Sequence, residues 1–133
     1  MYLLGVSDHV MIAHSLPDPF FGPAQGLHGA TYAVEVELRV PKLGVHQVVM
    51  DIGALRGELR TVLAEFDYRN LDEHPAFAGH MSTTECFAAH IAGELAARLC
   101  ALPSSAAPAS GAILRVLLRE SPVAYAAYER ELE

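Results

Sequence analysis

The sequence predicts an α+β fold, in which an antiparallel sheet of four strands carries two helices on one face. Two observations support this class. Segments with the alternation of strands lie towards both ends of the chain, and two segments with helical periodicity lie between them. Strands and helices grouped in this way are typical of antiparallel sheets that are covered on a single side. The chain has 133 residues, the size of one ordinary domain, so residues 1–133 are predicted to form one unit.

The first two strands are predicted on either side of a Pro-rich loop. Residues 2–14 are rich in apolar and β-branched residues, and this pattern breaks at Pro17. Residues 15–27 contain three Pro and two Gly, which disfavour regular structure. Because its two adjacent Phe are costly to leave in water, we expect this loop to fold over an apolar pocket as a lid. Residues 28–40 alternate between apolar and polar side chains, which predicts a long strand with one face in water.

The two helices are predicted in the middle of the chain. Apolar residues recur at spacings of three and four from Leu55 to Phe66, and again from Phe87 to Leu99. Between these helices, residues 67–81 have the composition of a polar loop. Ser82 and Glu85 have the spacing of a capping box, which predicts that the second helix starts there and runs to about residue 102.

The last two strands are predicted to form a hairpin. A connector rich in Pro, Ser and Ala spans residues 103–111, and two extended segments follow it on either side of Ser121 and Pro122. This hairpin completes the predicted sheet of four strands.

Charge and hydropathy argue against nucleic acid and membranes as partners. Nine basic and sixteen acidic residues give a formal charge of −7, with no Lys/Arg cluster to neutralise a row of phosphates. The apolar runs are shorter than the roughly 18–20 residues that a membrane-spanning helix needs. The N-terminus also has no basic region before its apolar stretch. We therefore expect a cytoplasmic protein without nucleic-acid or membrane partners.

Five short blocks follow one another along the chain: HGATYAVEVELR, VVMDIGAL, DYRNLD, STTECFA and ILRVLLRESPVAYAAY. In order and spacing they resemble the family of 6-pyruvoyltetrahydropterin synthases and 6-carboxytetrahydropterin synthases, from about residue 2 to residue 129. The resemblance implies the T-fold of that family, in which subunits place their sheets side by side to close a barrel. It further implies a homo-oligomer, a trimer or a hexamer of stacked trimers, with pockets for a small-molecule substrate at the subunit interfaces.

The zinc site that the resemblance implies is altered in this chain. The family holds zinc with three histidines, and His14 and His28 match two of them, whereas the third position is Ala30. Alanine has no donor atom, so zinc is implied here with an incomplete set of ligands. The position of the family's catalytic cysteine is Ala24. The candidates for a replacement zinc ligand are His9, His74 and His80.

The resemblance also assigns catalytic and substrate-binding residues. The family's catalytic Asp-His pair corresponds to Asp67 and Tyr68. Because tyrosine has an ordinary pKa near 10, Tyr68 is a poor base at neutral pH, but it can act as an acid or a hydrogen-bond donor. The glutamate that anchors the pterin ring in the family corresponds to Glu120. The residues expected to bind substrate are Glu120, Thr83, Glu85 and His28.

Three interpretations of the function follow. In the first, the protein is a lyase or cyclase that acts on a small ring-bearing substrate, using Asp67 and Tyr68 to move protons and Glu120 to orient the ring. In the second, it is a working 6-pyruvoyl- or 6-carboxytetrahydropterin synthase whose missing groups come from other residues. In the third, it is a non-catalytic binding or assembly subunit.

Overall fold

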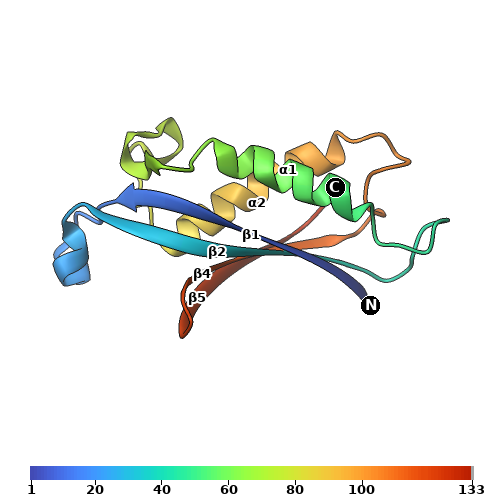
Figure 1. Ribbon diagram of the computed structural model, residues 1–133, viewed down its shortest axis with the longest axis horizontal. Helices are drawn as coiled ribbons and strands as arrows, with labels where there is room; N and C mark the ends of the chain where they lie inside the picture. The colour runs from blue at the N-terminus through green and yellow to red at the C-terminus, as the bar shows by residue number, and fades with distance from the viewer. Residues whose placement is uncertain (133) are drawn as a thin grey trace.

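The computed structural model describes residues 1–132 and contains one sheet and two α-helices (Figure 1). The strands are β1 (Tyr2–His14), β2 (His28–Val40), β3 (Arg69–Asn70), β4 (Ile113–Ser121) and β5 (Ala124–Glu131). The α-helices are α1 (Ile52–Ala64) and α2 (Thr84–Cys100). Short 3₁₀ segments are η1 (Pro19–Gln25), η2 (Leu71–Glu73) and η3 (Pro75–Phe77).

The sheet has the strand order β3-β1-β2-β4-β5. The four long strands pair antiparallel in the way the sequence predicts, and β1 and β2 run side by side over their full length, from the Tyr2–Val40 pair to the His14–His28 pair. The sequence did not predict β3, which lies parallel to β1 and pairs only with Ile12 and Ala13. A strand of two residues is too short to show alternation, so no sequence pattern identifies it.

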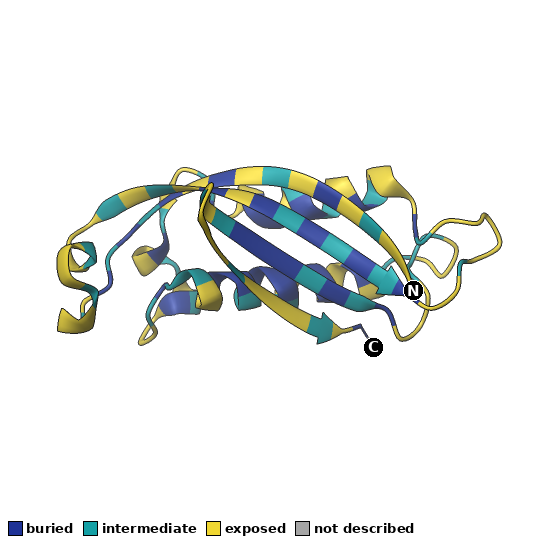
Figure 2. Ribbon diagram, turned by 90° about the horizontal axis from the view of Figure 1, so that it is seen from below, coloured by how far each residue is buried: buried dark blue, intermediate teal, exposed yellow. Residues whose placement is uncertain are grey.

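Both helices lie on one face of the sheet, as Figure 1 shows, and the core fills the space between the two layers. Even-numbered residues of β1, β2 and β4 point towards the helices and are mostly buried, whereas odd-numbered residues face the other side (Figure 2). The helices contribute the apolar stripes that their periodicity predicts, including Leu55, Leu59, Phe87 and Leu95. No helix among the described residues is long and apolar enough to cross a membrane.

The start of α2 differs from the prediction. The N-cap residue is Thr83, whose hydroxyl accepts a hydrogen bond from the Cys86 N–H at 3.2 Å. Glu85 is therefore the second residue of the helix and cannot close a capping box, which requires the third position. Ser82 does not cap the helix because its hydroxyl donates to Asp72 instead, at 2.9 Å.

The two loops also differ from expectation. Residues 15–27 form η1 beyond the end of the sheet, and Phe20 is 87% exposed, so within one chain the loop does not close over an apolar pocket (Figure 1). Residues 67–81 are more structured than their polar composition suggests. They contain β3, η2 and η3 and bury Leu71 and Phe77 in the core.

Candidate functional site

A polar cluster lies at the end of the sheet where β1 ends and β2 begins. His14 and His28 are paired across these strands, and their ring centroids are 4.6 Å apart. Both occupy even-numbered positions, so they continue the helix-facing rows that hold Ile12 on β1 and Tyr32 on β2. The rule that buries apolar side chains in the middle of the sheet thus places two imidazoles at its end.

His14 is buried and is held by the chain that precedes α2. Its Nδ1 lies 2.8 Å from the carbonyl oxygen of Ser82 and 3.3 Å from the Ser82 hydroxyl. Burial lowers the pKa of His14 below its ordinary value, although the hydrogen bond to the Ser82 carbonyl opposes this effect. His14 is therefore a neutral imidazole at pH 7.

The neighbouring imidazole of His28 is oriented in a similar way. Its Nδ1 lies 2.8 Å from the carbonyl oxygen of Gly26. Because a carbonyl oxygen can only accept a hydrogen bond, Nδ1 carries the proton in both histidines, and Nε2 keeps its lone pair. The strand pair therefore presents two nitrogen acceptors next to each other.

Two carboxylates and a phenol complete the cluster. Glu120 lies at an irregularity of the β4–β5 ladder, between the paired residues Arg119 and Ser121. Burial raises the pKa of Tyr32, and the charges of Glu120 and Glu85 raise it further, so both carboxylates lie within electrostatic reach of its phenol. The Tyr32 hydroxyl is 3.3 Å from the hydroxyl of Thr84 in the first turn of α2. The cluster therefore joins β1, β2, β4 and the N-terminus of α2.

Asp67 is bound to neighbouring groups at the edge of β1. Its carboxylate accepts a hydrogen bond from the Met11 N–H at 2.9 Å and forms an ion pair with Arg60 at 3.1 Å. Arg60 also contacts Asp8 at 3.2 Å, which links α1 to β1. These bonds attach residues 67–70 to the first strand.

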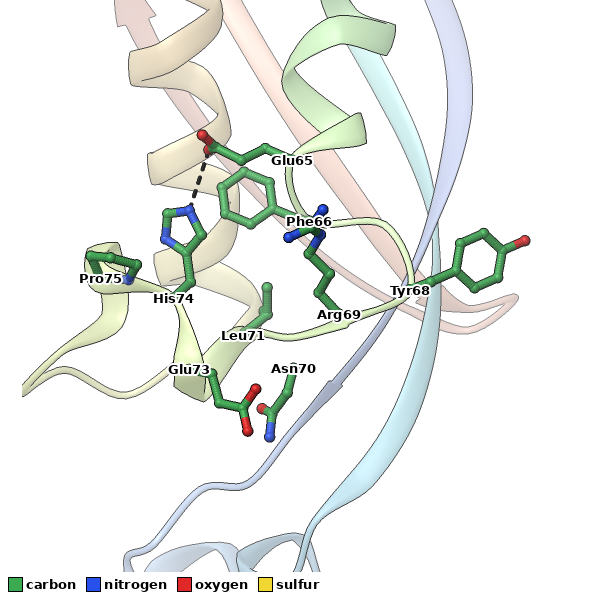
Figure 3. A pocket seen from close by; sticks show the side chains of 9 residues that line it. All are labelled: Glu65, Phe66, Tyr68, Arg69, Asn70, Leu71, Glu73, His74 and Pro75. Atoms are coloured by element: carbon green, nitrogen blue, oxygen red, sulfur yellow. Dashed lines mark ion pairs between the residues drawn. The ribbon is translucent and has the colours of Figure 1, made fainter.

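Tyr68 follows in an uncommon backbone conformation. Its φ is 60°, in the left-handed region that bulky residues rarely adopt, and its N–H donates to the Met11 carbonyl at 2.7 Å. The side chain is 80% exposed and points away from the cavity beside it (Figure 3). Within one chain, the Tyr68 phenol is therefore directed outwards, on the side of the strands away from the helices (Figure 3).

The cavity beside Tyr68 has a volume of about 430 Å³ and lies along residues 65–75. His74 and Glu65 form an ion pair at its wall, with Nε2 and the carboxylate oxygen 3.4 Å apart (Figure 3). The other nitrogen of His74 accepts from the Ala76 N–H at 3.0 Å. His74 thus has a partner on each ring nitrogen.

The candidates for the missing metal ligand lie elsewhere or already have partners. His9 lies on the sheet face opposite His14 and is 3.9 Å from Asp8, while His74 has the partners just described. Among residues 1–132 no three His, Cys, Asp or Glu side chains converge in a way that could hold a metal ion. With Ala30 at the third position, His14 and His28 supply two imidazole nitrogens, one fewer than the three protein ligands that catalytic zinc sites use.

The structure thus brings together five residues that the sequence analysis selected: His14, His28, Thr83, Glu85 and Glu120. The Thr83 hydroxyl caps α2. Sequence reasoning missed Tyr32, Asp72 and Ser82. Tyr32 has the signature of a core residue, and Asp72 and Ser82 belong to segments whose course depends on tertiary contacts.

Comparisons with known proteins agree with this fold. A family model described as 6-pyruvoyl tetrahydropterin synthase matches residues 4–131. No curated protein matches the chain at a significant level.

Solved structures of several such enzymes resemble this chain. The Caenorhabditis elegans 6-pyruvoyl tetrahydropterin synthase is 25% identical, with a TM-score of 0.78 over 97% of this chain and 95% of the other. A Plasmodium vivax enzyme, a variant in a catalytic glutamate, is 19% identical, with a TM-score of 0.77 over 98% of each chain. The Plasmodium falciparum enzyme is 16% identical, with a TM-score of 0.77 over 98% of each. The match to the family model covers nearly the whole sequence, and the chain therefore belongs to the 6-pyruvoyl tetrahydropterin synthase family.

Proposed function

We propose that this protein is a pterin-synthase-like lyase or cyclase that acts on a small ring-bearing substrate without the cysteine and histidine of the family's proton relay. The observation that carries the proposal is the position of Glu120. It stands at an irregularity of the β4–β5 ladder, and its charge reaches both His14 and Tyr32. Strand irregularities of this kind often redirect a side chain next to an active site.

In this proposal Glu120 binds the ring. An ionised carboxylate accepts two parallel hydrogen bonds from a ring N–H and an adjacent amine, which is the edge that a pterin presents. His28 and Glu85 lie around the same end of the sheet and contribute further polar contacts. Thr83 supports them by capping α2.

Asp67 and Tyr68 are proposed to move protons at a site that a second copy of the chain completes. Tyr68 is exposed and directed away from the helix layer, so its phenol is accessible to a neighbouring copy. A left-handed backbone costs a non-Gly residue roughly 1–2 kcal/mol, and such strain concentrates at functional positions. The backbone of Met11 binds both the Asp67 carboxylate and the Tyr68 N–H, which anchors this segment to β1.

The proposed assembly is a trimer or hexamer closed by sheet edges. On its outer side β1 pairs with β3 only at Ile12 and Ala13, and β5 is the last strand of the sheet described here. Pairing between β1 of one copy and β5 of the next would cover both edges, which are otherwise prone to non-specific association. It would also bring Tyr68 of one copy towards its neighbour.

A non-catalytic binding protein is the second candidate. It is favoured by the contacts of Asp67, whose two carboxylate oxygens already bind Met11 and Arg60. A carboxylate engaged in this way has a structural role that needs no chemistry. The two candidates differ in whether a bound ligand is converted.

The test combines binding and turnover of reduced pterins, including dihydroneopterin triphosphate, measured by calorimetry and mass spectrometry. We expect Glu120→Gln to weaken binding by about 10- to 100-fold, because one charged hydrogen bond is lost. Glu129→Gln is the matched control, since Glu129 lies on β5 and pairs with Arg39 at the surface. Equal binding by the Glu120→Gln variant and the wild type would overturn the role of Glu120.

Tyr68→Phe separates the two candidates. We expect binding to persist and turnover to fall by about 10²- to 10⁴-fold, the range for loss of an acid–base group. Mixed oligomers of the Tyr68→Phe and Glu120→Gln variants should regain part of the activity, because some sites then receive both intact residues. Ligand binding without conversion by the wild type would instead identify a binding protein.

A further inference from the structure

The charged groups around the candidate site are carboxylates. Glu120 stands at the irregularity near the end of β4, and Glu85 lies in the first turn of α2. The charges of both reach the phenol of Tyr32, which is buried. Asp72 accepts a hydrogen bond from the Ser82 hydroxyl at 2.9 Å, and its charge reaches the end of β1. Three negative charges therefore lie around this end of the sheet.

The basic residues are distributed differently. All nine Lys and Arg of the chain fall among the described residues. Two of them, Arg69 and Arg119, are near this end of the sheet. The others lie on the helices, or in or just beyond the opposite half of the sheet: Arg39, Lys42, Arg56, Arg60, Arg98, Arg115 and Arg130.

Neither of the two nearby arginines pairs with the carboxylates of the site. Arg119 is on the sheet face away from the helices, where its Nε lies 3.5 Å from the Glu35 carboxylate and its guanidinium lies 4.6 Å from the centre of the Tyr125 ring. Arg69 is on β3, three strand positions from β4, which at the usual spacing is about 14 Å. Its side chain lines the cavity along residues 65–75 (Figure 3). Among residues 1–132, no Lys or Arg forms an ion pair with the three carboxylates.

Two other sources of positive charge are already engaged. The N-terminus of α2 carries a partial charge of about +0.5, but Glu85 lies in its first turn and the Thr83 hydroxyl binds the Cys86 N–H. A neighbouring copy that brings Tyr68 would also bring Arg60, which is bound by two carboxylates of its own chain. Neither source offsets the charge of the site.

We infer that the candidate site takes a ring compound that is uncharged or positively charged, and that it excludes phosphate esters. Proteins bind phosphate groups with Arg, Lys or free helix N-termini, whereas carboxylates repel them. The same carboxylates accept hydrogen bonds from ring N–H groups and amines, so they favour a nitrogen-rich ring. The inference rests on the proposed function because it names the substrate class of the same site.

The experiment compares dihydroneopterin with dihydroneopterin triphosphate, which differ only in the phosphates, and also tests inorganic tripolyphosphate alone. Calorimetry on the intact protein, freed of metal ions with EDTA, measures the three affinities at low and high salt. We expect dihydroneopterin to bind at least about 10-fold more tightly than its triphosphate, and tripolyphosphate not to bind at millimolar concentration. High salt should narrow the difference because it screens the charges at the site.

Two substitutions on α2 test whether the location of the charge matters. Glu85→Lys and Glu94→Lys each raise the formal charge of −7 by the same two units. Glu94 lies nine residues further along α2, about 14 Å from Glu85, where it pairs with His90. We expect Glu85→Lys to reduce the preference for dihydroneopterin by about 10-fold, and Glu94→Lys to change it by less than about 3-fold.

Binding of tripolyphosphate, or tighter binding of the triphosphate than of dihydroneopterin, would overturn the inference even if the variants do not fold. Equal effects of Glu85→Lys and Glu94→Lys would overturn it as well, because the net charge of the chain and not the site would then set the preference. If neither pterin binds, the proposed role of Glu120 fails, and tripolyphosphate still decides whether the site excludes phosphate.

Discussion

The two ends of the β1–β2 strand pair follow the same alternation but carry different chemistry. At one end the helix-facing row contains Leu4, Leu38 and Val40, next to a largely apolar cavity of about 850 Å³ formed with residues 43–52 and 104–107. At the other end the same row holds His14 and His28. Position in the strand decides which side chains are buried. Residue type decides whether their burial stabilises the fold or orients polar groups.

At the apolar end, burial contributes stability directly, at roughly 25 cal/mol per Å² of apolar surface removed from water. At the polar end, burial costs free energy unless each polar group finds a partner. The structure supplies these partners from distant parts of the chain, through Ser82 and Asp72 for His14. At the polar end these hydrogen bonds offset the cost of burial and orient the groups, so substitutions at the two ends should behave differently.

Leu38→Ala gives the largest effect and tests the apolar side of this comparison. Leu38 is fully buried among β1, β4 and the helices, and we expect its truncation to lower the free energy of unfolding by about 2–5 kcal/mol. Urea denaturation measures this loss. The control Leu3→Ala, on an exposed side chain of β1, should change stability by less than about 0.5 kcal/mol. Similar losses in both variants would show that burial in the helix-facing row does not add stability at the apolar end.

Acidification tests the polar end. The pKa of folded His14 is lowered by burial, so the unfolded state binds its proton more readily than the folded state. The stabilising contribution is complete above the unfolded pKa of about 6.5 and is lost as the pH falls below it. The slope from this single group cannot exceed about 1.4 kcal/mol per pH unit.

Urea denaturation between pH 8 and pH 5, with EDTA present, measures how the free energy of unfolding depends on pH. Between pH 6.5 and pH 5, this free energy should fall less steeply for His14→Gln than for the wild type. The lowered pKa of Asp72 adds a second loss of stability at more acidic pH. If the free energy of unfolding of His14→Gln depends on pH as steeply as that of the wild type, the pKa of His14 does not differ between the folded and unfolded states.

Thr83→Ala tests the boundary between the polar end and the helix layer. Thr83 caps α2 through the Cys86 N–H, so its loss should cost about 1 kcal/mol in thermal or chemical denaturation. Glu85→Ala should cost less, a few tenths of a kcal/mol from the lost charge in the first turn, because Glu85 does not occupy the capping-box position. A larger loss from Glu85→Ala than from Thr83→Ala would instead support the capping box of Ser82 and Glu85 that the sequence predicted.

Tyr68→Gly has the smallest effect on stability and the opposite sign. Glycine adopts a positive φ without the penalty of a Cβ, although it gains more entropy in the unfolded state, so we expect a net stabilisation of up to about 1 kcal/mol. Turnover should fall at the same time if the phenol is functional. The control Arg69→Gly, at a neighbouring position without a positive φ, should destabilise the protein. A destabilised Tyr68→Gly variant would show that the phenol contributes to the fold.

Much of the fold follows from local patterns in the sequence. Alternation in residues 28–40 and helical spacing from Leu55 and from Phe87 predict the long strands and both helices, because one buried face imposes a period on each element. The start of α2 was wrong by one residue, since Ser82 and Thr83 are equally good caps in isolation. The competing bond from Ser82 to Asp72 decides between them.

The sequence by itself determined the α+β class and the family. These depend on periodicity and on the order of motifs, which are properties of neighbouring residues. Only the tertiary structure decided that Asp72 and Ser82 support His14, that Asp67 binds Met11 and Arg60, and that Phe20 stays exposed. The contacts of Ser82 with His14 and of Met11 with Asp67 join residues more than 50 positions apart, and no local pattern encodes such a contact. The shorter contacts, and the exposure of Phe20, depend on how a loop is placed by the rest of the fold.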